Sequence, residues 1–310
     1  MDYVPGIGDV TVGTSMAITP ALVEATAMRL NYALPESGST LFAVRGASLD
    51  SGADGGRMLD SITVRRVRPN HVDFRCLIGV LDRSSRKVCL YAGSTVPEFA
   101  HVRANLRRIG GCNMSPPGLY RFHVGLHGRT KRFKQPGALL QAAPTVVLRT
   151  TRTGVYDVSD QDCFWDKGEF GNNLHSAIFT GNAPKFSSAG CQIVRGTYER
   201  EGWIPAGDFA SFRLSAGLSA RRSGAVDLTT PEDGRAFHYA LFTFSELFGQ
   251  ANNAFGQRGL LRYGSSGQQV SALQQRIGAR ASGSFDAATM ERWLAHQIEQ
   301  GGQEYPIATV

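Results

Sequence analysis

Two residues that could do chemistry together, His175 and Cys191, lie sixteen positions apart, and the cysteine ends the run Ser187-Ser188-Ala189-Gly190-Cys191. A cysteine attacks a carbonyl carbon as its thiolate, but a thiol with a pKa of about 8.5 is mostly protonated at neutral pH. A histidine with a pKa of about 6.5 can take that proton and later return it. The pair therefore indicates nucleophilic catalysis, although either residue alone is also compatible with a structural role, since free cysteines are often buried.

The surroundings of this pair resemble a known signature. The segments Asn173-Leu174-His175-Ser176 and Ser188-Ala189-Gly190-Cys191 are similar to the pattern of the L,D-transpeptidases (the YkuD family), which is a histidine, a spacer and Ser-His-Gly-Cys. Upstream, Ser115-Pro116-Pro117-Gly118-Leu119-Tyr120 resembles the Thr-Pro-x-Gly-x-Tyr turn that opens a strand of that fold. The resemblance implies an α+β protein in which residues 41–250 form a mostly-β, L,D-transpeptidase-like sandwich.

The same resemblance implies a role for each residue of the signature. Cys191 would be the nucleophile, His175 the base and then the acid, and the main-chain carbonyl of Ser176 would orient the imidazole. The turn Ser188, Ala189 and Gly190 would present backbone N–H groups to an oxyanion. No metal and no organic cofactor is expected.

Two departures from the family pattern leave the activity open. Ala189 stands where the family usually has histidine, and Gln192-Ile193 replaces an apolar residue followed by arginine. We expect a cysteine acyltransferase or L,D-peptidase that acts on peptidoglycan stem peptides, by cross-linking or by hydrolysis. The alternatives are a non-catalytic, peptidoglycan-binding component of a phage particle or contractile injection system, and a cysteine hydrolase of an unrelated amide.

The C-terminal part resembles a second wall-related module. Residues 260–274 are similar to the opening of a peptidoglycan-binding module, and Gly283–Thr289 matches its Gly-x-Phe-Asp-x-x-Thr half. The pattern predicts two helices over 256–300, the first with a Ser266–Gln269 capping box and an apolar face of Val270, Leu273 and Ile277, the second capped by Asp286 and bearing Met290, Trp293, Leu294 and Ile298. The peptidoglycan-binding residues expected from the resemblance are Arg262, Tyr263, Gly267, Phe285 and Trp293.

Composition narrows the class of protein. The chain has 310 residues, 42% of them hydrophobic and 19% charged, as in ordinary globular proteins of one large or two smaller domains. The net charge of +7 suits an anionic partner such as the bacterial wall. The basic residues are dispersed except for the cluster from Arg129 to Lys134, interpreted as a solvated loop, and no basic-aromatic motif points to nucleic acid.

The location of the protein follows less directly. No apolar run approaches the ~20 residues that span a bilayer, so no membrane span is expected. The first residues lack the basic and apolar regions of a secretory signal. We therefore expect a protein of the cell envelope or periplasm, or one associated with a virion, that reaches the wall through phage lysis, a phage tail or an injection device.

The remaining cysteines and histidines suggest no metal site. The five cysteines form no CxxC pair, and Cys76 lies on an apolar strand face. His123 and His127 share a strand face, but four residues of strand span ~13 Å, so these two cannot easily hold one ion together with His175. A zinc hydrolase is not expected, while one of the two histidines remains a candidate for lining the cleft.

The elements that must position these residues follow from periodicity. Residues 1–40 are predicted to form an N-terminal arm with one helix that starts at the cap Thr19, has Val23, Ala27, Leu30 and Leu34 on one face, and ends at Pro35. This helix packs on the main domain or, alternatively, docks a larger assembly. Strands are predicted at 72–80, 87–92, 119–127, 145–149, 209–214 and 237–244, with a hairpin loop at 82–86.

Overall fold

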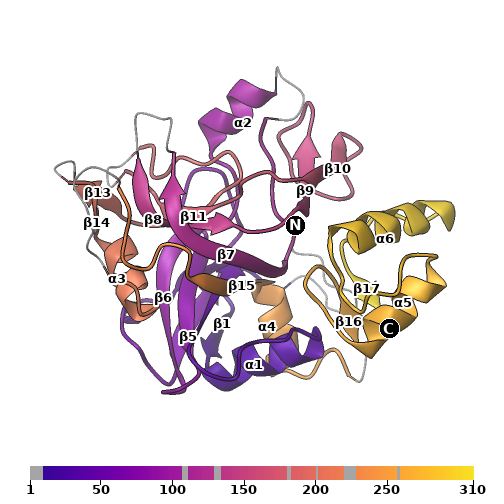
Figure 1. Ribbon diagram of the computed structural model, residues 1–310, viewed down its shortest axis with the longest axis horizontal. Helices are drawn as coiled ribbons and strands as arrows, with labels where there is room; N and C mark the ends of the chain where they lie inside the picture. The colour runs from indigo at the N-terminus through magenta and orange to yellow at the C-terminus, as the bar shows by residue number, and fades with distance from the viewer. Residues whose placement is uncertain are drawn as a thin grey trace.

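The computed structural model describes residues 10–106, 111–128, 134–179, 183–199, 202–219, 228–256 and 259–310. Its central feature is an eight-stranded sheet that closes into a barrel in the order β11-β12-β6-β5-β2-β15-β7-β8 (Figure 1). These strands are β2 Ser39–Arg45, β5 Cys76–Asp82, β6 Lys87–Ser94, β7 Gly118–His127, β8 Gln135–Gln141, β11 Leu174–Ser176, β12 Gln192–Val194 and β15 Ala236–Thr243. The β-rich, mixed fold expected from the sequence is confirmed, but the main sheet is a closed barrel rather than two stacked sheets.

Several central strands are apolar on both faces because both faces are covered. On β2, Leu41 and Ala43 belong to one buried cluster, whereas Phe42 and Val44 belong to a second. The second cluster is completed by helices α1 Pro20–Arg29 and α4 Phe244–Ala251, which pack against each other. Burial on both faces removes the alternation that a half-exposed strand would show.

The hairpin of β5 and β6 is confirmed, with Asp82 paired to Lys87 around the expected loop. The first strand starts later than predicted, at Cys76. Its upstream residues form a turn instead, because the Asn70 side-chain oxygen accepts hydrogen bonds from the backbone N–H groups of Val72 and Asp73. Val72 is 53% exposed.

The prediction of a strand at 209–214 is wrong, because these residues lie in helix α3, Asp208–Ser215. Phe209 and Phe212 are both fully buried, and their spacing of three is that of a helix face. The strand predicted at 237–244 is confirmed as β15, which ends at Thr243. There Thr243 and Glu246 form a reciprocal capping box that starts α4.

The N-terminal segment, from residue 10 onward, packs on the rest of the protein. Strand β1 Ser15–Ile18 pairs with β4 Ile62–Arg66, which also pairs with β3 Ala47–Leu49. Thr19 caps α1 as predicted, but the helix ends at Arg29 and the chain turns at Asn31, which has a φ of 53°. Residues 1–9, and residues 129–133 of the basic cluster from Arg129 to Lys134, lie outside the described residues.

The C-terminal module contains β16 Leu260–Leu261, α5 Gln268–Arg276, α6 Ala287–Glu299 and β17 Ala308–Thr309. Because β16 pairs with β17, the module runs to the last residues instead of ending near 300. Asp286 caps α6 as predicted, whereas the Ser266–Gln269 capping box does not form, since Gly267 is the cap of α5. Met290 and Leu294 are buried, but Ile298 is exposed.

The remaining elements surround the barrel. Strands β9 Thr145–Thr150 and β10 Cys163–Gly168 form a hairpin that lies near α6, and α2 Phe99–Asn105 lies at the opposite end from α1 (Figure 1). A small pair of strands, β13 Thr197–Glu199 and β14 Ile204–Ala206, precedes α3. None of the helices in the described ranges combines the length and apolar character that crossing a bilayer requires.

Candidate active site

Parallel pairing of two short strands brings His175 and Cys191 together. Strands β11 and β12 pair in register, Leu174 with Gln192 and His175 with Ile193. Cys191 directly precedes β12, so it lies at the edge of the barrel beside the start of β11. A third residue, His127, reaches the same place from the end of β7, because β8 pairs with both β7 and β11.

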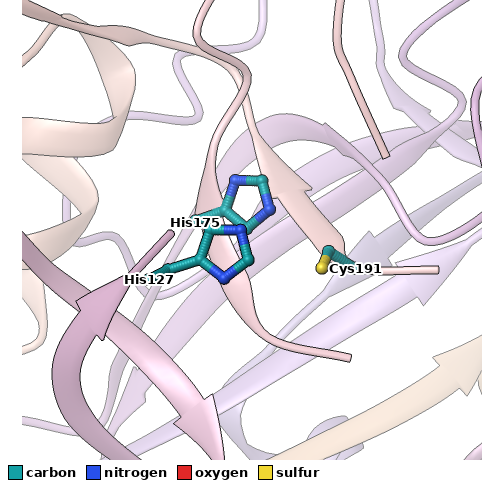
Figure 2. A group of neighbouring side chains, drawn as sticks. All are labelled: His127, His175 and Cys191. Carbon is teal, nitrogen blue, oxygen red and sulfur yellow. The ribbon is translucent and has the colours of Figure 1, made fainter. Parts of the chain in front are cut away.

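The three side chains form one compact cluster (Figure 2). One nitrogen of His127, one nitrogen of His175 and the Cys191 sulfur all lie within 4.8 Å of one another. The two imidazole rings are stacked, with centroids 4.4 Å apart and planes inclined by 13°. The sulfur points toward the rings from the residue that precedes β12. Of the two candidates on this strand, His123 and His127, it is His127 that joins the cluster.

Two contacts meet at Nδ1 of His175 and favour opposite tautomers. The shorter, at 2.8 Å, is to the Ser176 carbonyl oxygen, which can only accept and favours a proton on Nδ1. The longer, at 3.2 Å, is to the Gln135 amide nitrogen, a donor whose orientation is set by the Ser176 hydroxyl donating to the Gln135 oxygen. We assign the proton to Nδ1 on the shorter contact, which is the expected one between His175 and the Ser176 main chain. In this tautomer Nε2 has the lone pair that can accept a proton from Cys191.

A different set of hydrogen bonds determines the tautomer of His127. The backbone N–H of Gln141 donates to Oδ1 of Asn173 at 2.9 Å, which turns the Asn173 amide nitrogen toward His127. That nitrogen donates to Nδ1 of His127, also at 2.9 Å. Nδ1 is therefore a hydrogen-bond acceptor, and the proton of the neutral ring is on Nε2.

His127, His175 and Cys191 form the group of potential metal ligands in the described part of the chain, and a cysteine with two histidines is a zinc-like set. The outer hydrogen bonds do not fit this use. A ligating histidine usually donates its other N–H to an acceptor, whereas Nδ1 of His127 receives a hydrogen bond from Asn173. One nitrogen of His127 is thereby occupied and the other carries a proton, so neither is ready to bind a cation.

The turn before the cysteine is held on both sides. The Ser188 hydroxyl accepts from the Gly190 N–H at 3.1 Å and donates to the Cys191 carbonyl at 2.8 Å. The Ala189 carbonyl accepts from the backbone of Asn113 at 2.9 Å. The Gly190 N–H expected to face an oxyanion is thus bonded within the turn, and it becomes a donor to substrate only if Ser188 rotates.

Gly190 is required at its position by a close approach of two asparagines. A Cβ placed there would lie 2.6 Å from the side-chain oxygens of both Asn113 and Asn172. The Asn172 amide donates to Asn113 and to the hydroxyl of Ser115, so these buried groups form a polar cluster behind the turn. The contact between Asn113 and Asn172 joins segments 59 residues apart in the chain, so no local pattern in the sequence indicates it.

Gln192 is buried and has a structural role. Its side-chain nitrogen donates to the Gly190 carbonyl at 3.2 Å, and its oxygen accepts from the Tyr239 hydroxyl at 3.1 Å. The side chain thus ties the cysteine turn to β15 on the far side of the barrel interior. Cys191 itself is partly exposed, and its sulfur lies 3.6 Å from the Gly171 carbonyl.

Three of the residues expected to bind peptidoglycan have little exposed surface and make contacts within the protein. Arg262 is 2% exposed and forms an ion pair with Glu246, while its Nε donates to the Tyr32 hydroxyl at 2.6 Å. Tyr263 donates to the Pro144 carbonyl at 2.8 Å, and Phe285 lies in the core. These side chains attach the module to the barrel. Gly267 is exposed and Trp293 partly so, with the Trp293 N–H bonded to Tyr305.

Comparison with known proteins does not assign the chain to a family: no protein-family model, curated protein or solved structure matches it significantly. The functional conclusion therefore depends on the site geometry and on the residues of the signature.

Proposed function

We propose that the protein is a cysteine acyltransferase or peptidase that acts on peptidoglycan stem peptides. The observation that carries this proposal is the placement of Cys191 beside His175, whose Nδ1–H is bonded to the Ser176 carbonyl. That bond leaves the imidazole in the tautomer that a general base needs. A base that lies beside a nucleophile and is oriented by a third group is the common arrangement of nucleophilic catalysis.

The chemical sequence uses only these residues. The thiol proton moves from Cys191 to Nε2 of His175, and the thiolate attacks the peptide carbonyl carbon. As the carbon–nitrogen bond breaks, Nε2–H gives its proton to the leaving amine, and a thioester remains on Cys191. Attack by an amine of a neighbouring stem peptide then gives a cross-link, and attack by water gives hydrolysis.

The choice of peptidoglycan rests on two sequence resemblances that point to one polymer, in the cysteine signature and in the C-terminal module. The net charge of +7 is favourable for an anionic wall. In this proposal the protein works in the cell envelope or is delivered to it by a virion or injection device. Of the module residues expected to bind the wall, Gly267 and Trp293 have exposed atoms, whereas Arg262 is buried in an ion pair with Glu246.

The test is mass spectrometry of purified muropeptides after incubation with wild type, Cys191→Ala and Cys163→Ala. Cys163 is a matched control because it is also partly exposed but is not part of the histidine cluster. We expect new products with wild type and Cys163→Ala, and none with Cys191→Ala. The product masses separate cross-linking from hydrolysis. Unchanged muropeptides in all three samples, at several stem-peptide compositions, would refute the proposal and favour a wall-binding structural component.

A further inference from the structure

The stacking of His127 on His175 has a consequence for the proton transfer. When His175 takes the proton of Cys191, its ring becomes a cation whose centroid is 4.4 Å from that of His127. A cation within about 6 Å of an aromatic face is attracted to it, and more strongly when water is excluded. His175 is almost fully buried, so this attraction is little weakened by solvent.

The stack helps only if His127 stays neutral, because two positive rings at this separation repel each other. The Asn173 amide provides that condition. It donates to Nδ1 of His127, and its own orientation is fixed by the backbone N–H of Gln141. Protonating Nδ1 would set two donors against each other, so the network favours the neutral ring.

We infer that His127 is a positioning residue of the cysteine site: held neutral by Asn173, its ring keeps the His175 imidazole in place and stabilises the imidazolium that forms with the Cys191 thiolate. The inference rests on the proposed use of Cys191 as a nucleophile, but it concerns the activation of the thiol and not the identity of the substrate. It adds a second histidine, from a strand outside the signature, to the pair that the sequence indicates.

The test compares variants that separate the aromatic face of His127 from its volume. His127→Phe keeps a flat ring, whereas His127→Leu keeps only apolar bulk, and His127→Met serves as a second non-aromatic variant should His127→Leu fold poorly. His123→Leu is the matched control, because His123 lies four residues earlier on β7 and is outside the cluster. The measurement is the rate of iodoacetamide alkylation of Cys191 at pH 7, read by peptide mass spectrometry, with the melting temperature of each variant recorded.

We expect His127→Leu to slow alkylation roughly five- to thirtyfold, the range that a cation–aromatic contact implies. His127→Phe and His123→Leu should stay close to wild type, and His175→Ala should be slower than all of them. Wild-type rates in folded His127→Leu and His127→Met would overturn the inference, as would a loss in His127→Phe equal to that in His127→Leu. The assay needs no peptidoglycan, so unchanged muropeptides with the expected alkylation pattern would refute the proposed substrate and leave the role of His127 supported.

Discussion

The buried ion pair between Arg262 and Glu246 allows a test of whether Arg262 attaches the C-terminal module to the rest of the protein or contacts peptidoglycan. The two side chains are 3% and 2% exposed, and Arg262 also donates to the Tyr32 hydroxyl. Burial is the strongest single effect and lowers the pKa of Arg262, but the charges and hydrogen bonds of Glu246 and Tyr32 together outweigh it and raise that pKa. Burial also raises the pKa of Tyr32 to about 12, so its hydroxyl stays neutral. The pair links the module to α4, and the hydrogen bond to Tyr32 links it to the turn after α1.

We expect Arg262→Met to lower the free energy of unfolding by about 3–5 kcal/mol, because it leaves the Glu246 carboxylate buried and uncompensated. Glu246→Gln is a suitable partner substitution, since glutamine can still accept from the Thr243 N–H in the capping box. The double variant should be more stable than the sum of the single effects predicts, by about 1–3 kcal/mol. Urea unfolding of the four proteins measures this coupling, with Arg276→Met as an exposed control on α5.

Pull-down on insoluble peptidoglycan separates this role from the one expected on the resemblance alone. At a temperature where Arg262→Met is folded, it should bind the wall as wild type does. An unchanged free energy of unfolding together with lost wall binding would show that the structural role assigned to Arg262 is wrong and that Arg262 contacts the polymer.

Three further predictions follow from the described contacts. Gly190→Ala should destabilise the protein by about 1–3 kcal/mol and slow alkylation of Cys191, because the added methyl overlaps Asn113 and Asn172. Gly56→Ala is the control: its methyl would meet its nearest atom at 3.6 Å, so neither effect is expected. Iodoacetamide at neutral pH should modify Cys191 before Cys163, because burial raises the pKa of the Cys163 thiol. Both should react before the buried cysteines, Cys76, Cys89 and Cys112. A reversed order of modification in peptide mapping would contradict the site geometry. Hydrogen bonds from Lys185 and Asn70 lower the pKa of Asp73 to about 2. The ionised carboxylate therefore stabilises the protein above its unfolded pKa of about 3.9, and this effect is lost as the pH falls toward 2. The stability difference between wild type and Asp73→Asn should shrink over that range, and a constant difference in acid titrations of unfolding would contradict the prediction.

Local patterns in the sequence predicted the elements whose cause is local. The Thr19 cap followed by Pro20, the Asp286 cap and the hairpin of β5 and β6 all depend on neighbours within a few residues, and all are confirmed. The spacing of His175 and Cys191 likewise led to a correct expectation of proximity. The predicted strand at 209–214 was wrong because apolar residues three apart suit a helix, and the helix was decided by packing of Phe209 and Phe212 on the barrel.

Other features depend on contacts between distant segments, which no local pattern contains. Arg262 resembles a surface residue of a binding module, but its burial is set by Tyr32 and Glu246, which come from two other elements. His127 was one of two equivalent histidines on a strand until the closure of the barrel placed β7 and β11 on either side of β8. The sequence by itself determined which residues could supply a thiol and a base. Only the tertiary structure decided that a second imidazole stacks on that base and that Asn173 keeps it neutral, because those contacts join segments 46 to 48 residues apart in the chain.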